Sequence, residues 1–201
     1  MRIFFTMTAV VTGLTLMAIT AEADYQAGLR AYRAHDYKSA LKEFKSNPTR
    51  DSQYNLGVMY FKGEGVNADP LEGVEWFRKA AAKGQVQAQF VLGTIFDGGK
   101  NVTQDRAAAA RWYRKAAEQG HPQAQFNLGL MYTNGEGVSK DRAEAVVWLK
   151  KAAGNGHQDA GRLLKTMGEK VPPQAMPKPD KNSSKSSAAG TPSELPPGHP
   201  R

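Results

Sequence analysis

Two histidines have the spacing that most resembles a binding site. His121 and His157 stand 36 residues apart, and Gln85 stands 36 residues before His121. A protein-bound zinc ion takes three or four ligands from cysteine, histidine or carboxylate side chains. No further ligands accompany the two histidines, and a glutamine occupies the third position. We therefore predict polar residues at the turn into a helix, and no metal site.

Catalytic chemistry has little support in the chain. The absence of cysteine excludes thiol catalysis, cysteine metal sites and disulfides. There is no H-E-x-x-H motif, and no Ser-x-x-Lys that starts a helix facing a pocket. Lys100 and Asn101 stand in a loop without catalytic partners. Because no nucleophile can be paired with a base, we predict no catalytic residues and no cofactor, and a cell-wall or β-lactam-active enzyme is the least favoured function.

An internal repeat determines which elements carry these residues. Trp76, Trp112 and Trp148 stand 36 residues apart and begin the similar segments WFRKAAAKG, WYRKAAEQG and WLKKAAGNG. The same interval separates Leu56, Leu92, Leu128 and Leu164, and also Gly57, Gly93 and Gly129. A fixed period of this length predicts stacked helical units rather than one central core.

Each repeat predicts two helices. In the third repeat, Pro122 suits the first turn of one helix, and Asp141 with Glu144 predicts the N-terminal cap of the next. We expect the partner helix to approach closely at the glycine that follows each leucine. We also expect all three tryptophans to be mostly buried, and the basic pairs that follow them, such as Lys150 and Lys151, to lie on a solvated helix face.

The repeated pattern A-Q-x-x-L-G-x-x-Y-x-x-G-x-G-V-x-x-D-x-x-x-A-x-x-W-x-R/K-K-A-A-x-x-G resembles the Sel-1-like repeat, a relative of the tetratricopeptide repeat. The resemblance covers residues 51–157 well and 24–50 loosely. It implies an all-α fold, a right-handed α-solenoid of antiparallel helix pairs, and a role as adaptor or scaffold. It also implies a role in envelope signalling, exopolysaccharide control or host contact, which are roles of exported bacterial members.

The chain divides into seven segments on this pattern. They are a signal peptide at 1–23, a degenerate N-terminal helical pair at 24–50, repeats at 51–86, 87–122 and 123–158, a capping helix at 159–170 and a Pro/Ser/Lys tail at 171–201. The second repeat has Asn101 where the others have the second loop glycine, and asparagine tolerates the left-handed conformation. The composition of the tail predicts disorder. We favour a flexible linker over the alternative, a ligand for an aromatic groove.

The first residues predict export. Arg2 precedes an apolar stretch from Ile3 to Ile19, and Ala21-Glu22-Ala23 has the small-x-small pattern of a cleavage site. We predict cleavage before Asp24, with an uncleaved anchor as the alternative, and no membrane segment after cleavage. The predicted location is the periplasm, or alternatively the extracellular space.

The net charge of +8 favours an acidic partner over nucleic acid, which an exported protein rarely meets. We predict a protein–protein interaction scaffold in envelope signalling or assembly, with a secreted host-interaction factor as the alternative.

By analogy with tetratricopeptide grooves, the partner should bind the concave face formed by the first helices. The predicted residues are Val58, Phe61, Lys62, Thr94, Asp97, Leu130 and Thr133. Tyr54, Phe90 and Phe126 are also candidates, with core packing between repeats as the alternative. An exposed patch of Val58, Phe61 and Leu130 would mark an interaction site.

Overall fold

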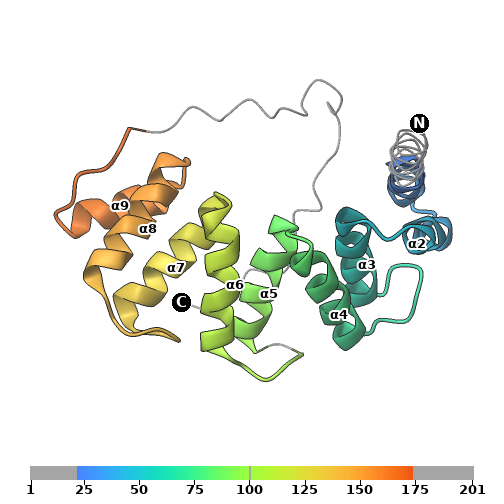
Figure 1. Ribbon diagram of the computed structural model, residues 1–201, viewed down its shortest axis with the longest axis horizontal. Coiled ribbons are helices and arrows are strands. Elements are labelled where there is room, and N and C mark those ends of the chain that lie inside the picture. The colour runs from blue at the N-terminus through green and yellow to red at the C-terminus, as the bar shows by residue number, and fades with distance from the viewer. Residues whose placement is uncertain (1–21, 100, 174–201) are drawn as a thin grey trace, which may run out of the picture. The chain divides into compact units, whose positions relative to one another are not determined.

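The computed structural model describes residues 22–99 and 101–173, and within them every regular element is a helix (Figure 1). Residues 22–33 are helical and are followed by α2 (Tyr37–Ser46), α3 (Arg50–Lys62), α4 (Pro70–Ala82), α5 (Val86–Gly98), α6 (Arg106–Glu118), α7 (Pro122–Asn134), α8 (Arg142–Gly154) and α9 (Gln158–Thr166). The predicted all-α solenoid of helix pairs is confirmed. The predictions for residues 1–21 and 174–201 lie outside the described residues.

The fold divides between Gln89 and Phe90 into two compact units. In the first unit, α3 and α4 form a closely packed pair. Phe77 of α4 is fully buried and lies against Gly57 of α3, where an added Cβ would come within 2.6 Å of its ring. Gly28, in the helix at 22–33, faces Phe44 of α2 in the same way, at 2.5 Å. A glycine therefore admits an aromatic ring at both helix pairs of this unit.

The second unit repeats the arrangement with different side chains. The ring of Tyr113 on α6 lies against Gly93 of α5, so an added Cβ there would overlap it. On α8, Leu149 lies against Gly129 of α7, with 2.8 Å between an added Cβ and the leucine Cγ. The prediction that the partner helix approaches closely at these glycines is confirmed.

The three tryptophans are mostly buried, as the sequence predicts, but to different degrees. Trp148 is 5% exposed, whereas Trp76 and Trp112 keep a larger part of their surface exposed. In each repeat the residue after the tryptophan occupies the core: Phe77, Tyr113 and Leu149 are all 1% exposed or less.

The basic pairs lie largely on a solvated face, as predicted, since Arg78, Lys79, Lys115 and Lys151 are exposed. The second member of each pair covers the tryptophan of its own helix, with 3.9–4.5 Å between the ammonium nitrogen and the ring centroid: Lys79 over Trp76, Lys115 over Trp112 and Lys151 over Trp148. In the second unit the first member reaches a later segment: Arg114 donates to the hydroxyl of Tyr132 on α7, and Lys150 pairs with Glu169, which follows α9, at 3.0 Å. Each lysine can cover its tryptophan because the two residues lie one turn apart on the same helix.

The second helix of each repeat begins as predicted. Asp69, Asp105 and Asp141 are the N-caps of α4, α6 and α8, and their carboxylates accept backbone N–H groups of the first turn. The predicted capping box at Glu144 differs in one respect. The Glu144 carboxylate accepts the indole N–H of Trp148 at 3.0 Å instead of reaching back to the N-cap.

The loop between the paired helices requires positive φ angles. Asn101 has φ 67°, which confirms that asparagine adopts the left-handed conformation there. Gly137 has φ 68°, and an added Cβ would overlap the backbone of Arg106 at the start of α6. Gly65 in the first unit lies close to Tyr37, the first residue of α2, with 2.8 Å between an added Cβ and the tyrosine carbonyl oxygen. In these two loops the second glycine thus lets the loop contact the second helix of the preceding pair.

Candidate functional site

The candidate site residues lie on the first helix of each repeat, α3 in the first unit, α5 and, in the second unit, α7. The N-cap fixes where these helices begin: Thr49 caps α3 and His121 caps α7, each by accepting a backbone N–H. At the corresponding position before α5, Gln85 Oε1 accepts the N–H of Ala88 at 2.6 Å. The prediction of polar residues at these turns is confirmed.

The predicted site residues of the first unit differ in how far they are exposed. Val58 is 3% exposed, so the expectation that it contributes to a surface patch is wrong. The physical reason is that α3 packs against both α2 and α4, which buries its middle turns on two sides. Tyr54 and Phe61 are half-buried, and their ring centroids lie 5.7 and 6.4 Å from that of Phe77. Lys62 keeps 31% of its side chain exposed and lies 3.9 Å from Glu64.

In the second unit the predicted residues of α5 form a polar group around a buried phenol. The hydroxyl of Tyr113 donates to Thr94 Oγ1 at 3.4 Å, and Thr94 donates to the carbonyl of Phe90 at 3.2 Å. Burial, with the nearby charge of Asp97, raises the pKa of Tyr113 to about 12, although hydrogen bonds with Thr94 and Asn127 oppose the shift. Tyr113 therefore stays protonated and acts as a donor at neutral pH.

On α7, Leu130 and Thr133 are half-buried, and Thr133 donates to the carbonyl of Gly129 at 2.8 Å. Phe126 is half-buried and packs on the core of α8 and α9. Its ring also stacks on His157, with 4.2 Å between the centroids. Phe126 therefore fits the alternative of core packing between repeats. Of these two apolar side chains of α7, Leu130 contributes less to packing within the protein.

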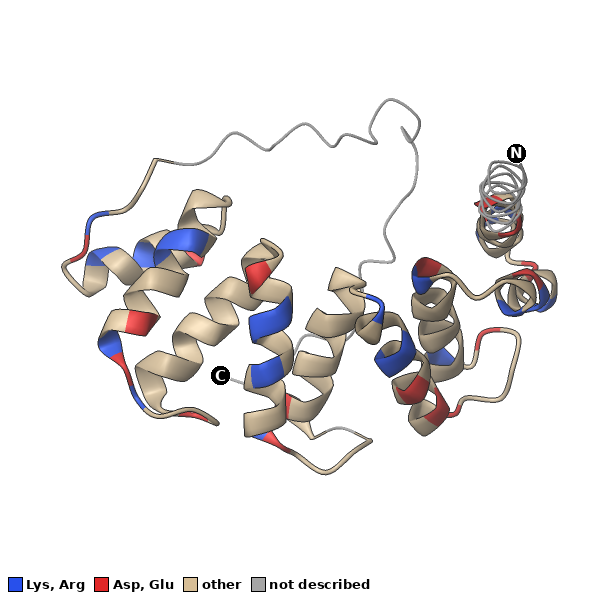
Figure 2. Cartoon of the chain, viewed as in Figure 1, with Lys and Arg blue, Asp and Glu red and all other residues tan. Residues whose placement is uncertain are grey.

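Asp97, which lies near the phenol of Tyr113, forms an ion pair. Its carboxylate lies 3.9 Å from the guanidinium of Arg106, and its side chain is 17% exposed. Arg106 lies equally far from Glu136, so it links the end of α5 to the loop that follows α7. Basic residues recur along α6 and α8 of this unit (Figure 2). Around Arg106, however, both signs of charge are present, because Asp97 and Glu136 flank it.

The repeated glutamines make structural hydrogen bonds that were not predicted from the sequence. Gln89 and Gln125 are 5% and 3% exposed, and their side-chain amides donate to the carbonyls of Ala81 and Ala117, at 3.1 and 2.9 Å. Each bond ties a first helix to the end of the preceding second helix. The available signal was a polar residue recurring at the same position of an otherwise apolar stretch, because buried amides need partners.

Two further features bear on function. Among the described residues, no group of three or more His, Cys, Asp or Glu side chains could hold a metal ion. In the same part of the chain, no helix is long and apolar enough to cross a membrane.

Comparison with known proteins gives a consistent picture. A family model described as Sel1 repeat matches residues 50–85, 86–121 and 122–157. A Sel1 repeat protein from Oxalobacter formigenes is 36% identical with a TM-score of 0.69, over 73% of this chain and 44% of that one. A protective antigen present in uropathogenic Escherichia coli strains is 40% identical with a TM-score of 0.60, over 64% of this chain and 28% of that one. The chain thus spans less than half the length of either protein. No curated protein matches it.

Proposed function

The chain belongs to the Sel1 repeat family, and from this we propose that it is an exported protein–protein interaction scaffold that acts in bacterial envelope signalling or assembly. Sel1 repeat proteins generally act as interaction scaffolds and are typically not catalysts. The proposal rests on one observation: the residues that build each repeat are constant, while other positions of the first helix vary. The leucine and the glycine of the first helix and the aspartate that caps the second helix are the same in each repeat, while Phe61, Asp97 and Thr133 differ at one equivalent position.

The proposed partner surface comprises the half-buried first-helix side chains with unequal chemistry. In the first unit these are Phe61 and Lys62 on α3, and in the second unit they are Leu130 and Thr133 on α7. Half-buried apolar side chains can contact a partner without first unfolding their own helix, and aromatic side chains contribute strongly to interfaces. The net charge of +8 favours an acidic partner.

The test of the surface is capture of a partner by crosslinking in intact cells, identified by mass spectrometry. Leu130→Ser, alone and with Phe61→Ser, should reduce capture strongly while helicity and Tm are retained in the single variant. Val147→Ser is the matched control, because Val147 is an exposed apolar residue (46%) on a second helix, α8. Equal capture by the Leu130 variant and the control would rule out this surface.

Export rests on the segment at 1–23, whose apolar stretch ends in Ala21-Glu22-Ala23. N-terminal sequencing of protein from the envelope fraction should give Asp24 as the first residue. Recovery of Met1 would indicate a retained anchor instead.

A second candidate function is a secreted factor that binds host protein. It is favoured by the likeness to a protective antigen present in uropathogenic Escherichia coli strains. Fractionation distinguishes the two: retention in the periplasm supports the envelope scaffold, and accumulation in cleared culture medium supports the secreted factor. Turnover of a cell-wall or β-lactam substrate by purified protein would contradict both.

A further inference from the structure

The helix α9 has the position and the cap of a fourth first helix. Its N-cap is His157, whose Nδ1 accepts the N–H of Ala160 at 3.3 Å, just as His121 caps α7. Leu164 is fully buried, like the leucine of each earlier repeat. After α9 the described chain continues to residue 173 without another helix. The face of α9 that corresponds to the packed face of α7 therefore has no second helix in the described part of the chain.

Three substitutions distinguish this face of α9 from that of α7. Gly161 replaces the buried glutamine at 125, Arg162 replaces the aromatic residue at 126, and Lys165 replaces the glycine at 129. Arg162 and Lys165 are exposed. A lysine in place of the glycine opposes the seating of a large side chain such as Leu149. The replacements thus remove the aromatic residue and the glycine that lie on the packed face of α7. They introduce two cations, Arg162 and Lys165, in their place.

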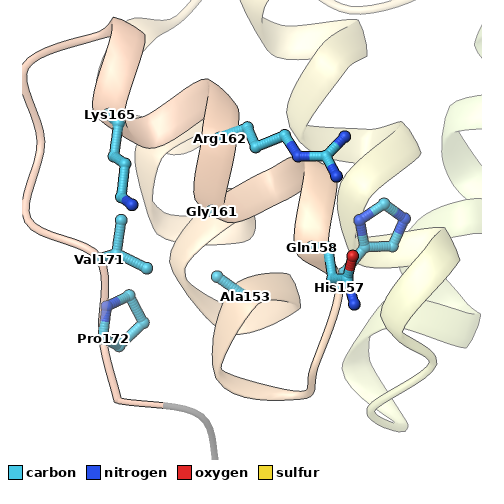
Figure 3. Close-up of a pocket in the computed structure, with 8 residues that line it drawn as sticks. All are labelled: Ala153, His157, Gln158, Gly161, Arg162, Lys165, Val171 and Pro172. Carbon is cyan, nitrogen blue, oxygen red and sulfur yellow. The ribbon is translucent and has the colours of Figure 1, made fainter.

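The loss of the glutamine side chain leaves space at this position. Gln125 spans from α7 to the carbonyl of Ala117. The corresponding residues are Gly161 and Ala153, and both line a pocket of about 400 Å³. In Figure 3, Lys165, Val171 and Pro172 lie on one side of this pocket and Arg162 lies on the other. The pocket therefore has a small, largely apolar floor between two cations.

We propose that this pocket on α9 is a binding site for an acidic peptide segment of a partner protein. The inference rests on the proposed interaction function and adds a surface separate from that of the first helices at Leu130. Lys165 has no ion pair within the described residues, and Arg162 donates to the exposed Asp159 at 2.8 Å. A peptide carboxylate would pair with Lys165 and share Arg162 with Asp159, while its aliphatic atoms contact Val171 and Pro172. Charge complementarity of this kind favours acidic over neutral segments.

The test uses the full mature chain and a fluorescently labelled short peptide that alternates glutamate and alanine. The same peptide with glutamine in place of glutamate is the reference. Wild-type protein should bind the acidic peptide at least about tenfold more tightly than the neutral one, and added salt should weaken the binding. Equal affinity for the two peptides would overturn the proposal.

Two variants locate the site. Gly161→Gln restores the side chain present in the other repeats, and an added Cβ at Gly161 meets its nearest neighbour, Val171, at an ordinary 3.5 Å. It should fill the pocket and reduce affinity at least about tenfold without lowering Tm. The double variant Arg162→Gln with Lys165→Gln should have the same effect, and because both side chains are exposed it should fold normally.

The controls separate this site from others. Lys140→Gln removes an exposed cation elsewhere in the same unit and should leave peptide affinity unchanged. Val147→Ser, which changes an exposed apolar residue of α8, should also leave it unchanged. If the Lys140 variant loses as much affinity as the double variant, binding follows net charge and the pocket is not the site. Failure of the peptide to bind would overturn the pocket while the crosslinking experiment still tests the scaffold.

Discussion

The imidazole of His157 stacks on the ring of Phe126, with 4.2 Å between centroids, while its Nδ1 accepts the backbone N–H of Ala160 at 3.3 Å. Its Nε2 lies 3.0 Å from Gln123 Oε1, which is an acceptor, so the proton belongs on Nε2. His121 makes the same pair of contacts, with the ring of Phe90 and the N–H of Ala124. Both histidines can cap a helix only with Nδ1 unprotonated.

This arrangement predicts a loss of stability in mild acid. Burial lowers the pKa of both histidines below their ordinary value of 6.5, and the charge of Asp159 opposes the shift only at His157. As pH falls through that value, the unfolded chain takes up protons that the folded chain does not, so the free energy of unfolding decreases. The contribution is fully present above the ordinary pKa and is lost progressively below it.

The measurement is thermal unfolding of wild type and the double variant His121→Gln with His157→Gln between about pH 7.5 and 5.5, a range that brackets the histidine pKa. The chain itself supplies the rationale for the replacement, because Gln85 caps α5 through its side-chain oxygen. We expect the wild-type Tm to fall more steeply than that of the variant. Parallel pH profiles would contradict the capping role.

A second prediction concerns the glycine that receives Leu149. Gly129→Ala places a methyl group 2.8 Å from the leucine Cγ and should cost about 1–3 kcal/mol of unfolding free energy through overpacking. Gly154→Ala is the matched control, because an added Cβ there meets nothing within 4 Å. The control should be neutral or stabilising by up to about 1 kcal/mol. Denaturant unfolding of both variants measures the difference, and equal effects would mean that the helices can separate at Gly129 without cost.

The third prediction separates two neighbouring aromatic residues. Tyr113 is 1% exposed, whereas Trp112 is half-buried under Lys115. Tyr113→Ala should therefore cost about 3–5 kcal/mol, and Trp112→Ala clearly less, although tryptophan is the larger side chain. Chemical denaturation of the two variants checks the order. A larger loss for Trp112→Ala would show that the tryptophan, as the sequence alone suggested, carries the packing.

The sequence predicts the helix pairs well because their determinants are local. A glycine that must admit Phe77, and an aspartate that must cap α4, recur at a fixed interval. The period does not specify which of two adjacent apolar residues points to the partner. Trp112 and Tyr113 differ by about 100° around the helix, and either could lie at the centre of the apolar stripe.

The candidate surface was less predictable for a related reason. The rule for a helix with one buried face assigns Val58 to the solvent side, but α3 is covered by α2 as well as α4. Consecutive residues from Leu56 to Met59 are consequently buried. How many sides of a helix are covered depends on contacts between elements distant in the sequence, and a single repeat does not contain that information.

The last prediction tests the buried amide that links α7 to its neighbours. Gln125 donates to the carbonyl of Ala117 and accepts from the side chain of Asn155, both at 2.9 Å. Gln125→Ala should cost about 1–3 kcal/mol, because it leaves a carbonyl and an amide without this partner. Gln158→Ala, at the exposed start of α9, is the control and should change the free energy of unfolding by less than about 0.5 kcal/mol. A double-mutant cycle with Asn155→Ala should show coupling, since the two side chains share one hydrogen bond. Additive effects would mean that Gln125 stabilises the fold by packing alone.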